Sequence, residues 1–143
     1  MGYNVLDKQK FQCKVSTVLN KDATQFGRLL MFDGKEDTCW CSDKDSPQWV
    51  KLQWESPISI SRFQIQFQGG FVGQECEVIV ALEGEKKVME PFYPEDINSI
   101  QTFSLSVPRI TRQISLNFIS SSDFFGRIII YKLGVLSHES AES

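Results

Sequence analysis

The chain has 143 residues and a mass of 16.4 kDa, the size of one domain, and 41% of its residues are hydrophobic. Fifteen Lys and Arg against eighteen Asp and Glu give a formal net charge of −3 and a pI near 5.2. Nucleic-acid-binding domains are usually basic, so this balance argues against direct nucleic-acid binding. No apolar run is long enough to cross a bilayer, so no membrane span is predicted.

Alternating apolar and polar residues predict β-strands along most of the chain. The predicted strands, in chain order, cover residues 11–19, 49–54, 63–67, 76–82, 103–107, 114–118 and 128–136. The last of these is almost continuously apolar, which predicts a strand buried on both faces. One short helix is expected within residues 23–30.

Turn signals separate these strands. The expected breaks are Ser56-Pro57, the glycine-rich stretch 68–73, a hairpin turn at 83–86, a loop around Pro91 and Pro94, and Pro108. Seven or eight short strands with regular punctuation predict an all-β sandwich or barrel. We expect a single domain over residues 1–136, followed by a flexible polar tail at 137–143.

The four cysteines predict reduced thiols. Cys39 and Cys41 form a C-x-C pair, a spacing that suits neither a mutual disulfide nor a zinc knuckle, and the N-terminus lacks the pattern of a secretory signal. With Cys13 and Cys76, they are expected to act as small core residues in a nuclear or cytoplasmic protein.

An enzymatic function is not expected. The only histidine, His138, lies in the polar tail, so no imidazole base is available inside the predicted domain. The sequence contains no nucleophile elbow, phosphate-binding loop or dinucleotide-binding fingerprint.

Two stretches carry a family resemblance. They are Met31 to Ser42, with its D-G and T-x-W elements, and Pro47 to Gln53, which enters a strand as W-V-x-L. They resemble the discoidin, or coagulation-factor C-type, domain. The resemblance implies an eight-stranded, galactose-binding-like jelly-roll β-sandwich.

Relatives in this family that bind calcium do so beside the D-G and T-x-W loop. If calcium is bound here, the resemblance implies Asp33 and Thr38 as ligands, with Glu36 and Asp37 nearby. Lys132 stands where the family usually places a glutamate, and an ammonium group repels a cation. We therefore expect no metal and no other cofactor. Asp33 and Thr38 should instead hydrogen-bond within their own loop.

Further blocks resemble a family of small nuclear-receptor-associated proteins. The blocks are 25–27, 65–71, 92–96, 100–103 and 123–128. This resemblance implies a non-enzymatic, intracellular interaction module that binds an orphan nuclear receptor and interferes with its binding to DNA. The alternative is a discoidin-type module that binds a carbohydrate or a lipid headgroup. The oligomeric state stays open.

Two sets of residues are candidates for contact with a partner or ligand. Phe124 and Phe125 are adjacent, and neighbours on a regular strand face opposite ways, so a turn at Gly126 re-aims one ring or one ring is exposed. Beside them, Arg127 is positioned to pair with Asp123, and aromatic residues next to an arginine are typical of binding hot spots. For a sugar ligand, the candidates by residue type are Arg28, Arg62 and Arg109, while Trp40 and Trp49 are expected in the core.

Overall fold

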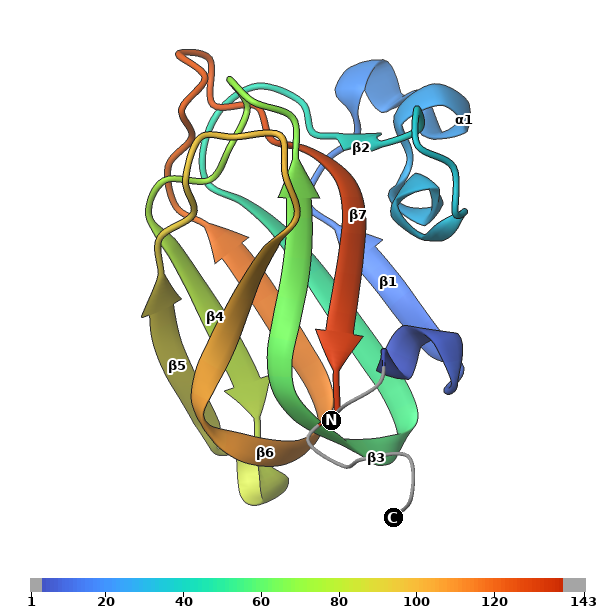
Figure 1. Ribbon diagram of the computed structural model, residues 1–143, viewed down its shortest axis with the longest axis vertical. Coiled ribbons are helices and arrows are strands. Elements are labelled where there is room, and N and C mark those ends of the chain that lie inside the picture. Colours follow the sequence, from blue (N-terminus) through green and yellow to red (C-terminus); the bar gives the residue numbers. More distant parts are fainter. Residues whose placement is uncertain (1–3, 138–143) are drawn as a thin grey trace.

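The computed structural model describes residues 4–137, which form seven β-strands and several short helices (Figure 1). The strands are β1 (Phe11–Val15), β2 (Trp40–Cys41), β3 (Gln48–Phe67), β4 (Cys76–Ala81), β5 (Lys87–Phe92), β6 (Gln101–Phe118) and β7 (Ile129–Leu136). The helical segments are α1 (Ala23–Phe26) and four 3-10 turns, η1 (Val5–Asp7), η2 (Leu19–Lys21), η3 (Arg28–Phe32) and η4 (Glu83–Glu85). The expected all-β fold with one short helix is confirmed. Within residues 4–137, no helix has the length and apolar character needed to span a membrane.

The strands form two antiparallel layers that share β3 and β6. The first half of β3 pairs with β1, and the second half pairs with β7. The second half of β6 pairs with β4, which in turn pairs with the edge strand β5. Because both long strands run from one layer into the other, the β3–β6 ladder joins the two halves of the sandwich along its length.

Two prolines mark the bends in these long strands. Ser56-Pro57 and Pro108 were expected to end strands, but Pro57 lies inside β3 and Pro108 lies inside β6. The β3–β6 register shifts between Gln53 and Ile58 and again between Ile60 and Arg62. A proline cannot donate to the ladder, so pairing is interrupted at these points, yet the chain bends and resumes the strand.

Other boundaries also differ from the expectation. The sequence predicts a loop around Pro91, but Pro91 lies in β5. Within residues 4–137, β5 pairs with β4 alone, and an edge strand tolerates proline because one side of it needs no partner. The first strand ends at Val15 rather than at residue 19. The last strand, β7, is not buried on both faces, because Ile129, Tyr131 and Lys132 are half-exposed. The hairpin turn at residues 83–86 is confirmed between β4 and β5.

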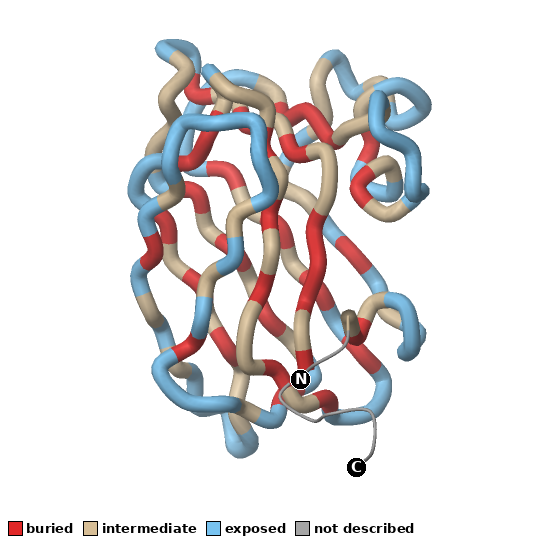
Figure 2. The backbone as a smooth tube through the Cα atoms, in the orientation of Figure 1, coloured by how far each residue is buried: buried red, intermediate tan, exposed pale blue. Residues whose placement is uncertain are grey.

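The core lies between the two layers, where buried residues alternate with exposed ones along the strands (Figure 2). Phe67 in β3 meets Phe118 in β6 edge-to-face, with ring centroids 5.8 Å apart, and Phe63 meets Phe92 in β5 at 5.0 Å. Such aromatic pairs join opposite layers and contribute more to stability than burial alone.

Ser137, the first residue of the expected tail, is buried. Residues 138–143 of that tail, with His138, lie outside the described residues.

Candidate functional site

Three loops meet at one end of the sandwich, at the top of Figure 1. They are residues 42–48, 68–73 and 119–128, and backbone hydrogen bonds tie them together. The amide of Asp45 donates to the carbonyl of Phe125 at 2.6 Å, and the amide of Ser122 donates to the carbonyl of Val72 at 2.8 Å. Loop 119–128 is therefore held on both sides by its neighbours.

An ion pair fixes the shape of loop 119–128. The Oδ2 atom of Asp123 accepts the side-chain Nε–H of Arg127 at 3.0 Å and its backbone N–H at 3.1 Å. Burial, the largest single influence, acts to raise the pKa of Asp123, but the hydrogen bonds from Arg127 and its positive charge together lower that pKa below its ordinary value. The pairing expected from the sequence is confirmed, and it closes the loop around residues 124 and 125.

The guanidinium group of Arg127 also lies near two aromatic rings. Its central carbon is 5.2 Å from the ring centroid of Phe71 and 5.6 Å from that of Phe125. Both distances are within the range of cation–π attraction. Arg127 thus links loop 119–128 to loop 68–73 and holds the Phe125 ring in place.

Both phenylalanines of loop 119–128 face solvent. Phe124 is 94% exposed and Phe125 is 57% exposed, and their rings meet edge-to-face with centroids 5.3 Å apart. The sequence left two alternatives, a turn at Gly126 that re-aims one ring or exposure of one ring; in the structure Gly126 forms a turn and both rings are exposed. Two adjacent exposed aromatic rings beside an arginine form a small apolar surface rimmed by charge, which we call the Phe124–Phe125 tip.

Gly126 makes this conformation possible. Its φ is +85°, in the left-handed region, and a Cβ placed on it would lie 2.7 Å from the carbonyl carbon of Asp45. Only glycine allows both the turn and this close approach.

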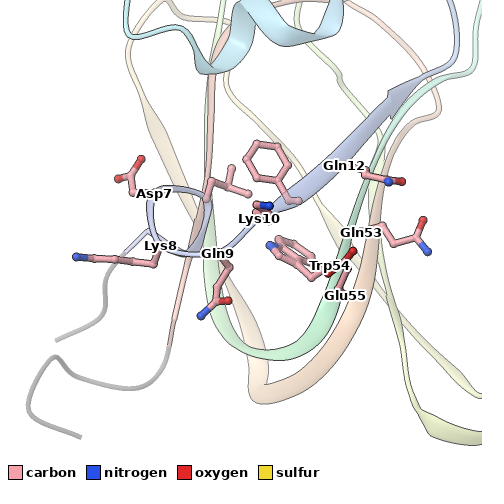
Figure 3. A pocket seen from close by; sticks show the side chains of 10 residues that line it. Asp7, Lys8, Gln9, Lys10, Gln12, Gln53, Trp54 and Glu55 are labelled. Atoms are coloured by element: carbon pink, nitrogen blue, oxygen red, sulfur yellow. The ribbon is translucent and has the colours of Figure 1, made fainter.

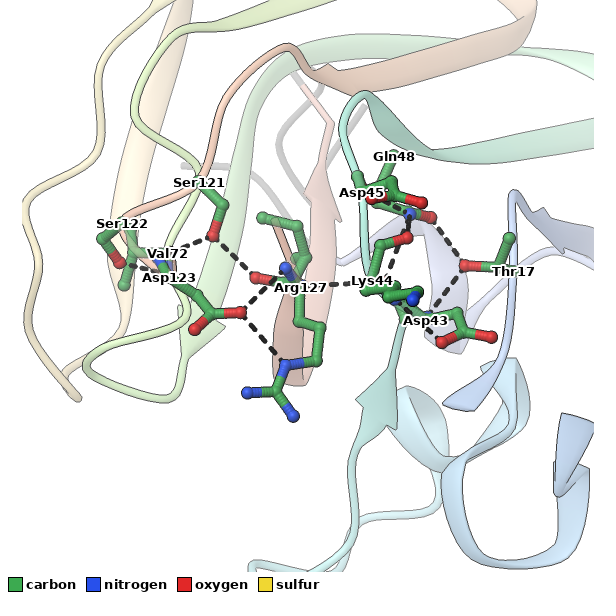
Figure 4. A network of polar contacts seen from close by, with 12 residues as sticks. Thr17, Asp43, Lys44, Asp45, Gln48, Val72, Ser121, Ser122, Asp123 and Arg127 are labelled. Carbon is green, nitrogen blue, oxygen red and sulfur yellow. Dashed lines mark hydrogen bonds and ion pairs between the residues drawn. The ribbon is translucent and has the colours of Figure 1, made fainter. Parts of the chain in front are cut away.

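Behind the tip, one buried amide supports loop 42–48 (Figure 4). The Nε2 atom of Gln48, a residue that is 3% exposed, donates to the carbonyls of Asp43, Lys44 and Asp45, the last at 2.7 Å. Its Oε1 atom accepts hydrogen bonds from the hydroxyls of Ser16 and Thr17. Every polar atom of this side chain is thereby paired, so loop 42–48 is a rigid base for the tip.

The expected calcium residues bond to one another. Thr38 Oγ1 donates to Asp33 Oδ2 at 2.6 Å, and the amide of Lys35 donates to Asp33 Oδ1 at 2.9 Å. The hydrogen bond from Thr38 is the main cause that lowers the pKa of Asp33. The Nζ atom of Lys132 lies 4.0 Å from a carboxylate oxygen of Glu36. Both oxygens of Asp33 already accept donors and an ammonium group stands close by, so this set does not fit a hard cation.

The two family tryptophans differ in burial. Trp40 is fully buried, as expected, and its indole N–H donates to the carbonyl of Thr17 at 2.9 Å. The expectation that Trp49 lies in the core is wrong, because it is half-exposed with the Lys51 ammonium 5.5 Å from its ring. On β3, Gln48 and Val50 face inward, so strand alternation turns Trp49 outward.

The three candidate arginines do not come together. Arg28 and Trp49 line one shallow pocket, whereas Arg109 pairs with Ile60 in the β3–β6 ladder and Arg62 pairs with Ser104. Phe71, Gln48 and Asp45, which shape the tip, were not identified from the sequence. The signals that pointed toward Phe71 were the glycine-rich stretch 68–73 and the family-resemblance block 65–71.

The cysteines act mainly as core residues, as expected. Cys13, Cys41 and Cys76 are buried, and Cys39 is half-buried with its sulfur 3.6 Å from that of Cys41. Burial raises the pKa of both Cys13 and Cys76 to about 12. The hydrogen bond between the paired thiols lowers the pKa of Cys39 and raises that of Cys41.

Comparison with known proteins identifies relatives of two kinds. The F5/8 type C domain model matches residues 12–130. Curated proteins named nuclear receptor 2C2-associated protein are similar over nearly their whole length. The protein from Danio rerio is 43% identical over 133 residues, which cover 90% of this chain and 92% of that protein. The protein from Homo sapiens is 42% identical over 132 residues, which cover 88% of this chain and 91% of that protein.

Solved structures share the fold at low sequence identity. An F5/8 type C domain from Bacteroides fragilis superposes with a TM-score of 0.81 at 15% identity and covers 97% of both chains. The family 32 carbohydrate-binding module of NanJ from C. perfringens, solved with galactose, gives a TM-score of 0.73 at 17% identity and covers 89% of this chain and 93% of that one.

Proposed function

Because this chain belongs to the F5/8 type C domain family and is similar along most of its length to nuclear receptor 2C2-associated proteins, we propose that it is a non-enzymatic interaction module whose partner is an orphan nuclear receptor. It acts in the nucleus or the cytoplasm as a repressor. Occupation of the receptor by this domain interferes with the receptor's binding to its DNA element.

The observation that carries this proposal is the exposure of the Phe124–Phe125 tip. A ring that is 94% exposed, as Phe124 is, gains nothing from burial in this molecule alone. A partner that covers both rings removes a large apolar area from water. The ion pair with Asp123 and the ring contacts of Arg127 hold the loop in place, so little conformational entropy is lost on binding.

The composition of the tip suits a protein partner. Aromatic residues and arginine are enriched among interface residues that dominate binding energy, and such residues cluster at the centre of an interface. At the tip, both residue types stand within one loop of the sandwich. Loops on a rigid β-scaffold are also where binding residues concentrate.

A binding assay with the purified nuclear receptor 2C2 and the full chain tests the proposal. The variant Phe124→Ser/Phe125→Ser should weaken binding roughly 30-fold or more, the effect of losing a hot spot worth about 2 kcal/mol. Ile110→Ser is the matched control, because Ile110 is 71% exposed and lies at the far bend of β6. Equal affinity in both variants and the unaltered chain would remove the tip from the interface. No binding by the unaltered chain would refute the receptor as partner.

One feature favours the alternative, a carbohydrate or lipid-headgroup ligand. Trp49 lines a shallow pocket of about 460 Å³ with Lys14, Lys21 and Arg28, so an aromatic face lies beside three cations. Such a surface suits an anionic headgroup or a sugar stacked on the ring. Binding to a glycan array or to anionic vesicles that is lost in Trp49→Ala, and retained in the Phe124→Ser/Phe125→Ser variant, would support this second function.

A further inference from the structure

A second pocket, far from the loop end, is larger than the Trp49 pocket. It has a volume of about 670 Å³, within the range of small-molecule sites, and it lies where η1 and the turn after it run past the start of β1 and the middle of β3. Its walls come from residues 6–12 and 53–55. In the sheet, Phe11 pairs with Trp54 and Gln12 with Gln53, so β1 and β3 form a continuous wall. In Figure 1, this region is at the lower end of the sandwich, opposite loop 119–128.

Trp54 presents an unpaired donor at this pocket. The residue is 3% exposed, and its indole Nε1 atom is buried with no hydrogen-bond partner among residues 4–137, a condition shared only with Nε of Arg109. An indole N–H donates and cannot accept, and a buried donor without an acceptor is unfavourable. The indole N–H of Trp40 shows how such a donor is normally satisfied, because it donates to the backbone carbonyl of Thr17 at 2.9 Å.

The charged groups around the pocket point in different directions (Figure 3). The carboxylate of Asp7 and the ammonium of Lys8 extend away from Trp54, whereas the side chain of Lys10 extends over the indole nitrogen in this view. A pocket lined by both an indole N–H and an ammonium group suits a hydrogen-bond acceptor with negative charge. Leu6 and Phe11 add apolar surface to the same pocket.

We propose that this pocket binds a small organic carboxylate with an apolar body. One carboxylate oxygen accepts the indole N–H of Trp54, and the ammonium of Lys10 pairs with the same group. The apolar body of the ligand lies against Leu6 and Phe11. Gln9 and Lys10, which line the pocket, are exposed, so their side chains are free to rotate and admit the carboxylate. This site is independent of the nuclear-receptor proposal, because it lies at the opposite end of the domain.

Titration of the full chain with phenylacetate, followed by proton–nitrogen NMR of the indole groups, tests the proposal. Three tryptophans give three indole signals, and the signal absent from Trp54→Phe belongs to Trp54. That signal should move downfield and saturate, while phenethylamine, which has the same ring and a positive head group, should leave it in place. An unmoved Trp54 signal, or an equal response to phenethylamine, would overturn the proposal.

A pair of lysine variants tests the role assigned to the ammonium group. Lys10→Gln should weaken phenylacetate binding about two- to fivefold, the range for one exposed ion pair. Lys8→Gln removes the same charge from a side chain that points away, so binding should stay within experimental error of the unaltered chain. Equal weakening in both variants would mean that only the overall charge matters, and the assigned geometry would be wrong.

Discussion

A single carboxylate oxygen, Oδ2 of Asp123, accepts both the side-chain and the backbone N–H of Arg127, at 3.0 and 3.1 Å. These two hydrogen bonds close the turn from Asp123 to Arg127 through the Asp123 side chain. A backbone hydrogen bond closes it as well, because the amide of Gly126 donates to the Asp123 carbonyl at 3.0 Å. The exposed rings of Phe124 and Phe125 occupy the two positions inside this closed turn. The orientation of the tip therefore depends on a polar pair that is itself only partly exposed.

The loss of stability caused by Asp123→Asn should depend on pH. The folded-state pKa of Asp123 lies below its ordinary value, which is near 3.9. The ionised carboxylate therefore stabilises the folded domain fully above about pH 3.9, and this contribution is lost as pH falls through the folded-state pKa. We expect Asp123→Asn to lower the free energy of unfolding by about 1 kcal/mol at neutral pH, a magnitude typical of a partly exposed, hydrogen-bonded pair. Urea denaturation at a series of pH values measures the difference. A difference that stays constant down to strongly acidic pH would contradict this account.

Gly126→Ala should destabilise the domain by about 1–3 kcal/mol, because the added Cβ meets the carbonyl carbon of Asp45 at 2.7 Å while φ is positive. Gly34→Ala provides the matched control. Gly34 also has a positive φ, +74°, but a Cβ there has nothing within 4 Å. The loss of stability in Gly34→Ala measures the effect of the positive φ alone. The additional loss of stability in Gly126→Ala measures the clash with loop 42–48. Equal destabilisation of the two variants would mean that the loops separate easily.

The hydrophobic alternation and the turn residues predicted the strands and turns that depend on neighbouring residues in the sequence. The alternation of Phe63, Ile65 and Phe67 with glutamines predicted an inward face, and the hairpin near Gly84 followed from turn residues. The continuity of β3 through Pro57 could not be predicted in this way. Proline is a local signal for a break, whereas β3 is kept in one strand by pairing on both sides with β1, β6 and β7.

The candidate site was predictable in its parts but not in its assembly. Adjacent phenylalanines indicated either a turn that re-aims one ring or exposure of one ring, and the spacing of Asp123 and Arg127 indicated a pair. The contact between Arg127 and Phe71 joins residues from separate loops, and no short-range pattern encodes it. The burial of Gln48 was also hidden, since a polar residue is an unexpected choice for the inward face and is tolerated only because five hydrogen bonds satisfy it.

The tryptophans offer a test of the corrected core assignment. Trp40→Ala removes a fully buried ring and should destabilise the domain by about 3–5 kcal/mol. Trp49→Ala removes a half-exposed ring and should cost about 1–1.5 kcal/mol. Chemical denaturation of the two variants gives both values. If Trp49→Ala proved as costly as Trp40→Ala, the ring would be buried in solution and the Trp49 pocket would not exist.

The four cysteines should differ in thiol reactivity, because their environments differ. At neutral pH a thiol with a pKa of about 12, as in Cys13 and Cys76, holds almost no thiolate, and Cys41 is similarly protected by its raised pKa. Cys39 is more accessible, and its pKa is lowered by the hydrogen bond with Cys41. The native protein should therefore react with an aromatic disulfide reagent in one fast phase, which Cys39→Ser abolishes and Cys76→Ala leaves unchanged.

The same reagent counts the thiols after unfolding without reductant. The reducing nucleus or cytoplasm that we propose as the location of this protein keeps all four thiols free, so the titration should give four. Cys39 and Cys41 are the two cysteines best placed to oxidise to a disulfide, since their sulfurs are 3.6 Å apart in the folded state. A count of two, restored to four by reductant, would mean that this pair oxidises in spite of its C-x-C spacing. A fast phase that survives in Cys39→Ser would instead place the reactive thiol elsewhere and would contradict the burial of Cys13 and Cys76.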